Sequence, residues 1–183
     1  MDIDIKFSEW LTIASIAGYK LEQYTRPAFV GHKRTPSDFN LMTIGQLIEL
    51  SDISDDDGSM YKIVEVTLGL TRDEIANSRA VDVVRYVGWA VTEVQRINKL
   101  FESLTPQATA KEKQAGIDTL HFGLFGMLDW YALRMGITNH DDVLQVPWMR
   151  IYKCMEMDNL RRAYERRYSN ITSEEVRTKH DRR

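Results

Sequence analysis

The chain has 183 residues, of which 43% are hydrophobic and 28% are charged. This composition is typical of a folded protein and excludes a disordered chain, which has few hydrophobic residues and a high net charge. The net charge of -3 excludes a global attraction to nucleic-acid phosphates. The single cysteine, Cys154, has no partner for an intramolecular disulfide, and such a lone thiol favours a reducing compartment.

The N-terminus lacks the features of a secretory signal. Residues 1–5 alternate apolar and acidic side chains, whereas a signal peptide begins with a basic stretch followed by an apolar one. No later segment approaches the run of about 18 uncharged apolar residues that a membrane span requires. We therefore expect a cytoplasmic protein that does not span a membrane.

The first predicted element is an amphipathic helix over residues 7–24. The apolar residues that recur there at intervals of three and four are Trp10, Leu11, Ile13, Ala14, Ala17 and Leu21. Residues 25–40 break this periodicity because they contain Pro27, Gly31 and Pro36. We expect them to form an irregular connector to the rest of the chain.

Capping residues divide the next part of the chain. Thr43 or Asn40 can cap a short helix over residues 44–50, and the acidic turn 54–57 can cap a second helix. Gly69 suits the C-terminal end of that second helix, because glycine adopts the left-handed conformation found there. The pattern therefore predicts two consecutive short helices.

A capping box follows directly. The segment Thr71-Arg72-Asp73-Glu74 has the spacing in which the first and fourth side chains cap each other's backbone, which predicts a helix over residues 72–76. Asn77 or Ser78 can then start a long helix that ends near Phe101. This helix is apolar on nearly all sides, so we expect it at the centre of the fold.

Residues 117–135 are dense in aromatic and aliphatic side chains, with interspersed glycines. This density predicts a buried helix whose glycines allow close packing, and Gly136 suits its C-terminal end. The polar stretch that precedes it, up to Gln114, predicts a loop or an exposed turn of helix.

The end of the chain predicts two more helices. Thr138 or Asn139 can cap a short helix over residues 141–145, and a last long helix follows over residues 148–169. The polar residues 171–183 predict a frayed tail. Together these patterns predict an all-α fold, a single-domain irregular bundle of six to eight helices. Its parts are an N-terminal helix (1–24), a connector (25–40), a helical core (41–170) and a polar tail (171–183).

The sequence lacks a recognisable catalytic, cofactor-binding or metal-binding motif. The acidic segment 52–58 misses the first and last ligands of a calcium loop, and the four histidines lack the spacing of a zinc site. His121 with Asp118 could act as a base, but a hydrogen-bonded helix histidine is the simpler interpretation. Cys154 has basic neighbours but no identifiable base. We expect a binding or assembly protein, not an enzyme.

The last predicted helix carries basic and aromatic side chains at helical spacing. These candidate partner-binding residues are Arg161, Arg162, Tyr164, Arg166, Arg167 and Tyr168. Three interpretations of this stretch stay open: a solvated helix face, a protein interface, in which arginine and tyrosine are frequent, and a nucleic-acid contact. The segment between Arg34 and Lys62 is instead acidic. This polarity favours association with a partner or with a second copy of the chain.

A longer segment resembles a known family. Residues 41–50 (Leu-Met-Thr-Ile-Gly-Gln-Leu-Ile-Glu-Leu) are followed by an acidic turn, a short helix and residues 68–75 (Leu-Gly-Leu-Thr-Arg-Asp-Glu-Ile). This arrangement resembles the tail assembly chaperones of tailed bacteriophages over residues 41–104. The resemblance implies a small, helical, non-catalytic protein without a cofactor, which keeps the helical tape measure protein in solution during tail assembly in the host cytoplasm.

Two other classes of protein remain as alternatives. One is a virion structural or connector protein, which would form a closed ring. The other is a regulator that binds nucleic acid through the arginine- and tyrosine-rich helix, for which steeply salt-dependent binding is expected.

Overall fold

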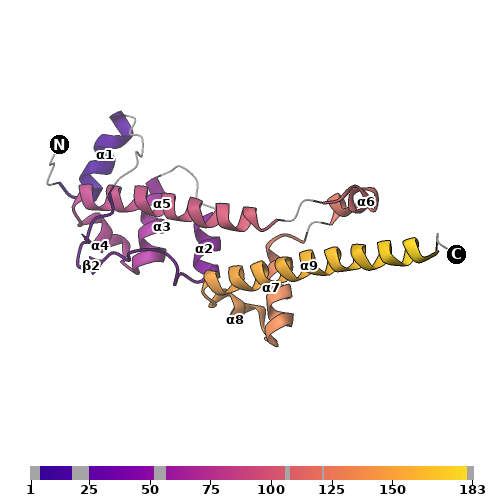
Figure 1. Cartoon of the computed structure of the whole chain (residues 1–183). Coiled ribbons are helices and arrows are strands. Elements are labelled where there is room, and N and C mark those ends of the chain that lie inside the picture. The colour runs from indigo at the N-terminus through magenta and orange to yellow at the C-terminus, as the bar shows by residue number, and fades with distance from the viewer. Residues whose placement is uncertain (1–4, 18–24, 52–56, 106–107, 121, 181–183) are drawn as a thin grey trace.

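The computed structural model describes residues 5–17, 25–51, 57–105, 108–120 and 122–180. These residues form an α-helical bundle with one small hairpin, which confirms the all-α prediction (Figure 1). The helices are α1 (Phe7–Ala17), α2 (Ile44–Ser51), α3 (Asp57–Leu68), α4 (Arg72–Ala76), α5 (Ala80–Ser103), α6 (Ala110–Gln114), α7 (Gly123–Met135), α8 (His140–Leu144) and α9 (Trp148–His180), with a short 3-10 helix, η1 (Ile117–Thr119). The described residues thus hold nine α-helices instead of six to eight, and the additional one is α6, which lies in the stretch predicted to be a loop or an exposed turn of helix.

The hairpin lies in the segment that we expected to be an irregular connector. Strand β1 (Phe29–Val30) pairs antiparallel with β2 (Lys33–Arg34). Gly31 lies in the turn between them with a φ of 55°, a left-handed conformation that favours glycine. The guanidinium of Arg26 donates hydrogen bonds to the hydroxyl of Thr35 (2.8 Å) and to its carbonyl (3.0 Å). The connector therefore has a fixed path.

The predicted cap of α2 is confirmed, with Thr43 rather than Asn40 in that role. The hydroxyl of Thr43 accepts a hydrogen bond from the backbone of Gln46 (3.2 Å), and the Gln46 side chain accepts one from the backbone of Thr43 (3.0 Å). The expected first helix is described only as far as Ala17, and the acidic turn proposed to cap α3 lies largely outside the described residues.

The capping box of α4 is also confirmed. The backbone of Glu74 donates to the hydroxyl of Thr71 (3.3 Å), and the backbone of Thr71 donates to the carboxylate of Glu74 (2.7 Å). This backbone hydrogen bond from Thr71 is the main reason that the pKa of Glu74 lies below its ordinary value. Gly69, with a φ of 65°, follows the end of α3 as predicted.

The start predicted for the long helix was wrong by two or three residues. Helix α5 begins at Ala80, and Arg79 precedes it without a side-chain cap. Asn77 instead ends α4, because its backbone and side-chain amides both donate to the carbonyl of Asp73. The hydroxyl of Ser78 donates to the carbonyl of Glu74 (2.8 Å), so it also belongs to the end of α4.

Helix α5 lies at the centre of the fold, as its sequence predicts. It packs against α1, α2, α3 and β1. Val83, Tyr86 and Val87 are fully buried along it. The hydroxyl of Tyr86 donates to the hydroxyl of Thr67 in α3 (2.8 Å), so the polar end of this buried side chain has a partner.

Trp148, the first residue of α9, joins the two halves of the chain. Its side chain is fully buried, and its indole NH donates to the carbonyl of Phe39 (2.7 Å). Its backbone NH donates to the carbonyl of Met42 (3.0 Å). The rings of Trp148 and Phe101 in α5 lie 5.9 Å apart. The start of α9 is therefore fixed against both the connector and α5.

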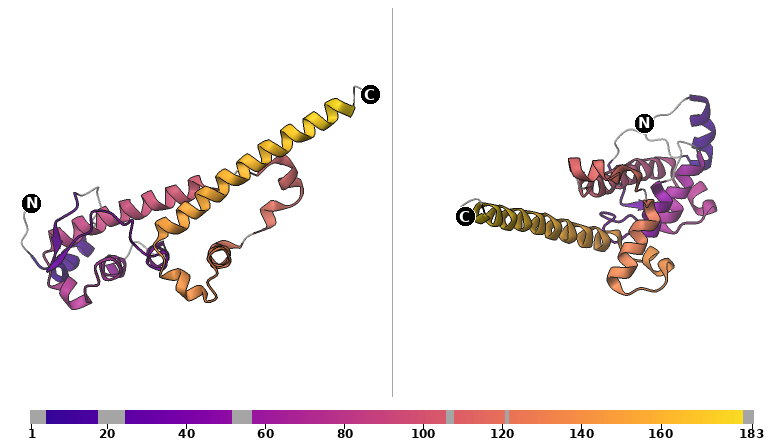
Figure 2. Two further views of the ribbon diagram at one scale, coloured as in Figure 1. Left: turned by 60° about the horizontal axis from the view of Figure 1, so that its bottom comes forward. Right: turned by 90° about the vertical axis from the view of Figure 1, so that its right-hand side faces the viewer.

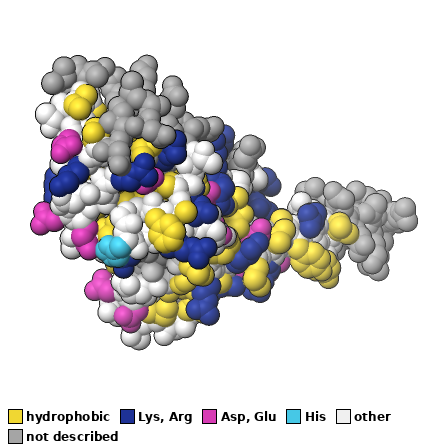
Figure 3. All heavy atoms as spheres, turned by 90° about the vertical axis from the view of Figure 1, so that its left-hand side faces the viewer, with side chains coloured by type: hydrophobic (Ala, Val, Ile, Leu, Met, Phe, Trp, Pro, Cys, Tyr) yellow, Lys and Arg dark blue, Asp and Glu magenta, His cyan; other side chains and the backbone are white. Residues whose placement is uncertain are grey.

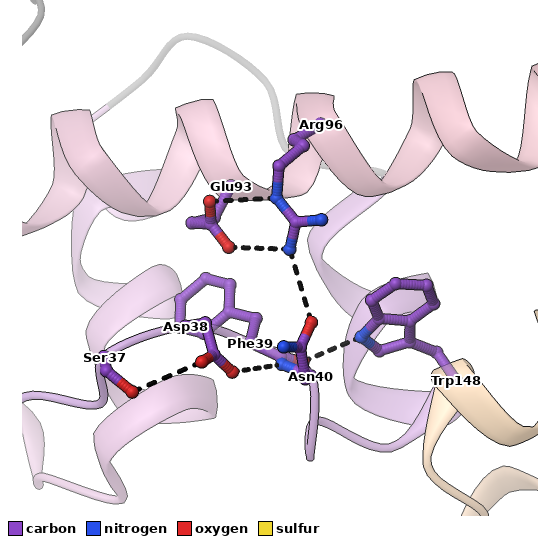
Figure 4. A network of polar contacts seen from close by, with 7 residues as sticks. All are labelled: Ser37, Asp38, Phe39, Asn40, Glu93, Arg96 and Trp148. Atoms are coloured by element: carbon purple, nitrogen blue, oxygen red, sulfur yellow. Dashed lines mark hydrogen bonds and ion pairs between the residues drawn. The ribbon is translucent and has the colours of Figure 1, made fainter.

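A polar network continues from this joint to α5 (Figure 4). Arg96 forms a two-pronged ion pair with Glu93 in the same helix and donates to the side chain of Asn40 (3.5 Å). The backbone of Asn40 donates to the carboxylate of Asp38 (2.9 Å). These contacts hold the connector against α5 next to Phe39, whose carbonyl binds Trp148.

Helix α9 extends from the body as an arm, so that α1 and the end of α9 lie at opposite ends of the molecule (Figures 1 and 2). The predicted end of the last helix near residue 169 was wrong, because α9 continues to His180. Residues 148–180 contain neither glycine nor proline, and they are rich in arginine and glutamate, which form helices readily.

The first prediction concerns the joint at Trp148. Trp148→Phe removes one of the two hydrogen bonds that the buried carbonyl of Phe39 accepts, and it leaves a cavity beside the smaller ring. We therefore expect a loss of about 1 to 3 kcal/mol in the free energy of unfolding. Trp130→Phe is the matched control, because Trp130 is only partly buried. Urea denaturation measures both. Equal losses in the two variants would contradict the role given to Trp148.

The second prediction concerns pH. Burial raises the pKa of the Tyr86 hydroxyl above its ordinary value of 10.0. The group binds its proton more tightly in the folded state, so its contribution to stability is complete below pH 10 and is lost as the pH rises further. At neutral pH, Tyr86→Phe should cost about 1 kcal/mol through the lost hydrogen bond.

Above pH 10, the stability of the wild type should fall towards that of Tyr86→Phe. Urea denaturation of both proteins between pH 7 and pH 11 measures the difference between them. A difference that stays constant over this range would contradict the burial of Tyr86.

Candidate partner-binding surface

Exposed apolar side chains gather in the second half of the chain. Fifteen large hydrophobic residues are exposed among those described, and twelve of them lie between Ile117 and Ile171. Single exposed hydrophobic residues are normal on a protein surface, but contiguous groups of them mark binding sites. The candidate surface is therefore built from η1, α7 and α9.

Helix α7 is much less buried than its sequence predicts. Only Leu128, Tyr131 and Ala132 are buried within it. Phe125 and Leu133 are 65% and 76% exposed, and Phe122, which immediately precedes the helix, is 71% exposed. Because α7 packs on α8 and α9 through part of its surface, the expectation of a buried helix is corrected to a helix with one bare apolar face.

The bare face has a regular spacing. Phe122, Phe125, Asp129 and Leu133 follow one another at intervals of three, four and four, which places them along one side of a helix. We call Phe122, Phe125 and Leu133 the α7 patch. The Phe125 ring lies 5.1 Å from the ring of His140, whose Nε2 is 3.2 Å from the Asp129 carboxylate.

One glycine of this segment serves the patch itself. A Cβ atom at Gly126 would lie 2.3 Å from the Cβ of Phe122. The glycine therefore makes room for Phe122, four residues earlier in the chain. The sequence predicted that such glycines allow close packing, but here the close neighbour comes from the same segment and not from another helix.

Helix α9 changes its environment along its length. Ile151 and Tyr152 are buried in the first turns. Asp158 forms an ion pair with Arg134 of α7, and the side-chain amide of Asn159 donates to the carbonyl of Leu104 at the end of α5 (2.6 Å). From residue 160 to residue 173 every side chain is exposed except that of Ala163. The arm thus begins after Asn159.

The six residues predicted to bind a partner lie on this arm, but they do not form a single face. Arg162 and Arg166 line a groove of about 600 Å³ between α9 and the segment that contains α6 and η1. The other residues lining it are Ala108, Glu112, Ile117, Glu165 and Ser169. This groove is charged at its rim and apolar at Ala108 and Ile117.

The two tyrosines lie on the other side of the helix. At about 100° per residue, Tyr164 and Tyr168 point about 160° and 200° away from Arg166. Their rings stack with centroids 6.2 Å apart, and the side chains are 60% and 63% exposed. Arg161 and Arg167 are exposed and flank the tyrosines. The structure therefore divides the predicted site between two faces of α9.

Helix α6 faces the arginine side of α9. It is an exposed helix, one of the two alternatives predicted for this stretch, and its capping box joins Thr109 and Glu112. The backbone hydrogen bond from Thr109 is the main cause that lowers the pKa of Glu112, and the positive charge of Arg166 adds to it. The arginine side is thus partly neutralised by Glu112 and Glu165.

The other candidates from the sequence gain no support from the described residues. Among the described residues, no group of three or more histidine, cysteine, aspartate or glutamate side chains could hold a metal ion. The side chains of His121 and Asp118 and most of the acidic segment 52–58 lie outside the described part. Glu49, part of the acidic stretch between Arg34 and Lys62, is paired with Lys62 at 2.8 Å.

The α7 patch was missed by the sequence reasoning. The sequence feature that could have predicted it is Asp129. This charged residue interrupts an otherwise apolar helix and marks the side of the helix that faces water. Counting helical positions from Asp129 places Phe122, Phe125 and Leu133 on that same side. Density of apolar residues alone had suggested burial on all sides.

Comparison with protein-family models, with curated proteins and with solved structures found no match to this chain. Within the described residues, no helix is both long enough and apolar enough to cross a membrane. A function must therefore be inferred from the chemistry of the surface itself.

The third prediction tests the exposure of the α7 patch. The double variant Phe122→Ser, Phe125→Ser should change the free energy of unfolding by less than about 1 kcal/mol, because both side chains are exposed. Leu128→Ala, one turn away on the buried side, should cost about 2 to 5 kcal/mol. Urea denaturation compares them. A patch variant as unstable as Leu128→Ala would show that the phenylalanines are buried.

Proposed function

We propose that this chain is a non-catalytic phage assembly protein, a tail assembly chaperone that acts in the host cytoplasm and binds a helical, tape-measure-like tail protein. The observation that carries the proposal is the α7 patch, in which three large apolar side chains are each more than 60% exposed. Such a patch on a folded chain is suited to cover the apolar face of another protein. The family resemblance over residues 41–104 supports the same class.

The patch suits an amphipathic helix as its ligand. Phe122, Phe125 and Leu133 form a row along one side of a helix, and helical ligands bind through rows of apolar residues at similar spacing. This apolar contact supplies affinity. Asp129 interrupts the row and Asp141 and Asp142 are exposed in neighbouring α8, whereas the groove beside α9 carries Arg162 and Arg166. The acids beside the patch favour a ligand that carries basic residues next to its apolar face, and this preference sets the orientation of the ligand.

A protein ligand fits this surface better than nucleic acid does. The groove that holds Arg162 and Arg166 also holds Glu112 and Glu165, so its charges are balanced. Phosphate binding depends on a local excess of positive charge, and it would gain nothing from the exposed phenylalanines. The two alternative classes, a virion connector and a nucleic-acid-binding regulator, are therefore kept as possible outcomes of the experiment below.

The fourth prediction tests this function. The tagged full chain is recovered with nuclease treatment from the cells that naturally produce it, and the bound proteins are identified by mass spectrometry. We expect a long helical tail protein. Its recovery should fall at least about tenfold, corresponding to about 1.4 kcal/mol, with Phe122→Ser, Phe125→Ser.

The matched control is Phe29→Ser, Leu41→Ser. It also removes two exposed hydrophobic side chains, but outside the candidate surface, so recovery of the tail protein should be unchanged. Capture of capsid or connector proteins, or only of nuclease-sensitive material, would overturn the proposal. Equal recovery with the patch variant would overturn the assignment of the α7 patch.

A further inference from the structure

The arm of α9 carries a second apolar surface, distinct from the α7 patch. We call it the outer stripe, and its members are Met157, Leu160, Tyr164, Tyr168 and Ile171. Each of them is between 56% and 67% exposed. They follow one another at intervals of three, four, four and three residues, which places them on one side of a helix. At about 1.5 Å per residue the stripe is about 21 Å long.

The outer stripe points away from the body of the protein. At about 100° per residue, the centre of the stripe lies about 160° around the helix from Trp148, which is buried. The side that faces the body continues along the arm as Arg162, Arg166 and Ser169, which line the groove with α6 and η1. Figure 3 shows hydrophobic side chains on the projecting arm. The fold of one chain therefore leaves the stripe bare.

The spacing of the stripe is the same in both directions along the helix. Tyr164 is its centre, Leu160 and Tyr168 lie four residues to either side, and Met157 and Ile171 lie seven residues to either side. Two copies of such a helix match each other when they run antiparallel. Tyr164 then meets its own counterpart, Leu160 meets Tyr168, and Met157 meets Ile171. All five apolar residues are covered in both copies.

The charges beside the stripe fit the same arrangement. Arg161 and Glu165 lie one turn apart on one flank of the stripe, and both are exposed. In the antiparallel pairing about Tyr164, Arg161 of one copy lies within about 3 Å along the axis of Glu165 of the other. The two-fold symmetry forms this pair twice. A parallel pairing would instead place Arg161 of one copy and Glu165 of the other on opposite sides of the seam, so these ion pairs would not form.

From this spacing and these charges we propose that a second copy of this chain covers the outer stripe, through antiparallel pairing of the two α9 arms about a two-fold axis at Tyr164. The pairing shares only Glu165 with the groove beside α6 and does not use the α7 patch, so a ligand can bind the patch in both subunits. A seam of about four turns is short, and small interfaces give weak association. We expect a dimer that dissociates at micromolar concentration.

The fifth prediction is the mass of the full chain in sedimentation equilibrium over a range of concentrations. The mass of the wild type should rise from 21.3 kDa towards twice that value. Tyr164→Glu places two like charges on the axis and should keep the chain at 21.3 kDa. Phe125→Glu is the matched control, because it adds the same charge to an exposed aromatic position of the α7 patch, and it should dimerise as the wild type does.

Charge exchange tests the flank. Arg161→Glu should weaken the dimer at least about tenfold, which corresponds to about 1.4 kcal/mol, and the added change Glu165→Arg should restore it.

Cysteine cross-linking tests the direction of the helices, in a background in which the native thiol is removed by Cys154→Ala. Tyr164→Cys should cross-link to its own counterpart under mild oxidation, whereas Met157→Cys should not, because its counterpart lies about 21 Å away along the axis. Cross-linking of both would reveal parallel pairing and overturn the proposal, as would a monomer at every concentration or a dimer that survives Tyr164→Glu. Capture of the tail protein depends on the α7 patch, so its failure would leave these results unchanged.

Discussion

The burial of Trp148 is the constraint on which the rest of the structure depends. This side chain is held by the carbonyl of Phe39 and packs against Phe101 of α5, so the start of α9 has one position and one direction. Arg96 and Asn40 support the connector from the α5 side. Because α9 is straight and uninterrupted, its direction at Trp148 decides where the arm lies and which of its side chains face water. Both apolar surfaces follow from this geometry.

The parts of the fold that could be predicted from the sequence are those decided within one or two helical turns. Thr43 and Thr71 cap helices through hydrogen bonds to residues three positions later, and Gly69 and Gly136 follow helices in left-handed conformations. Each of these features depends only on neighbouring residues, so its sequence spacing suffices. The prediction that Asn77 or Ser78 begins α5 was wrong because asparagine and serine side chains can also end a helix, as they do in α4.

The candidate site could be predicted only in part, because exposure depends on which elements meet. The arginines and tyrosines of α9 were correctly located on one helix, yet the body of the protein lies on the side of Arg162 and Arg166 and leaves Tyr164 and Tyr168 on the other. Phenylalanine is typical of a protein core, and only the packing of α7 on α8 and α9 determines that Phe122 and Phe125 face water. Apolar density shows that a segment must be covered, and not whether its own chain covers it.

Because the chain itself leaves Phe122, Phe125 and Leu133 bare, we propose that a helical tail protein covers the α7 patch. Hydrogen exchange of the full chain, alone and with the tail protein bound, measures which backbone amides become protected. The account predicts slower exchange in residues 122–135 of the complex and an unchanged rate in α3 and α5. Protection confined to other helices, with residues 122–135 exchanging as fast as in the free chain, would contradict it.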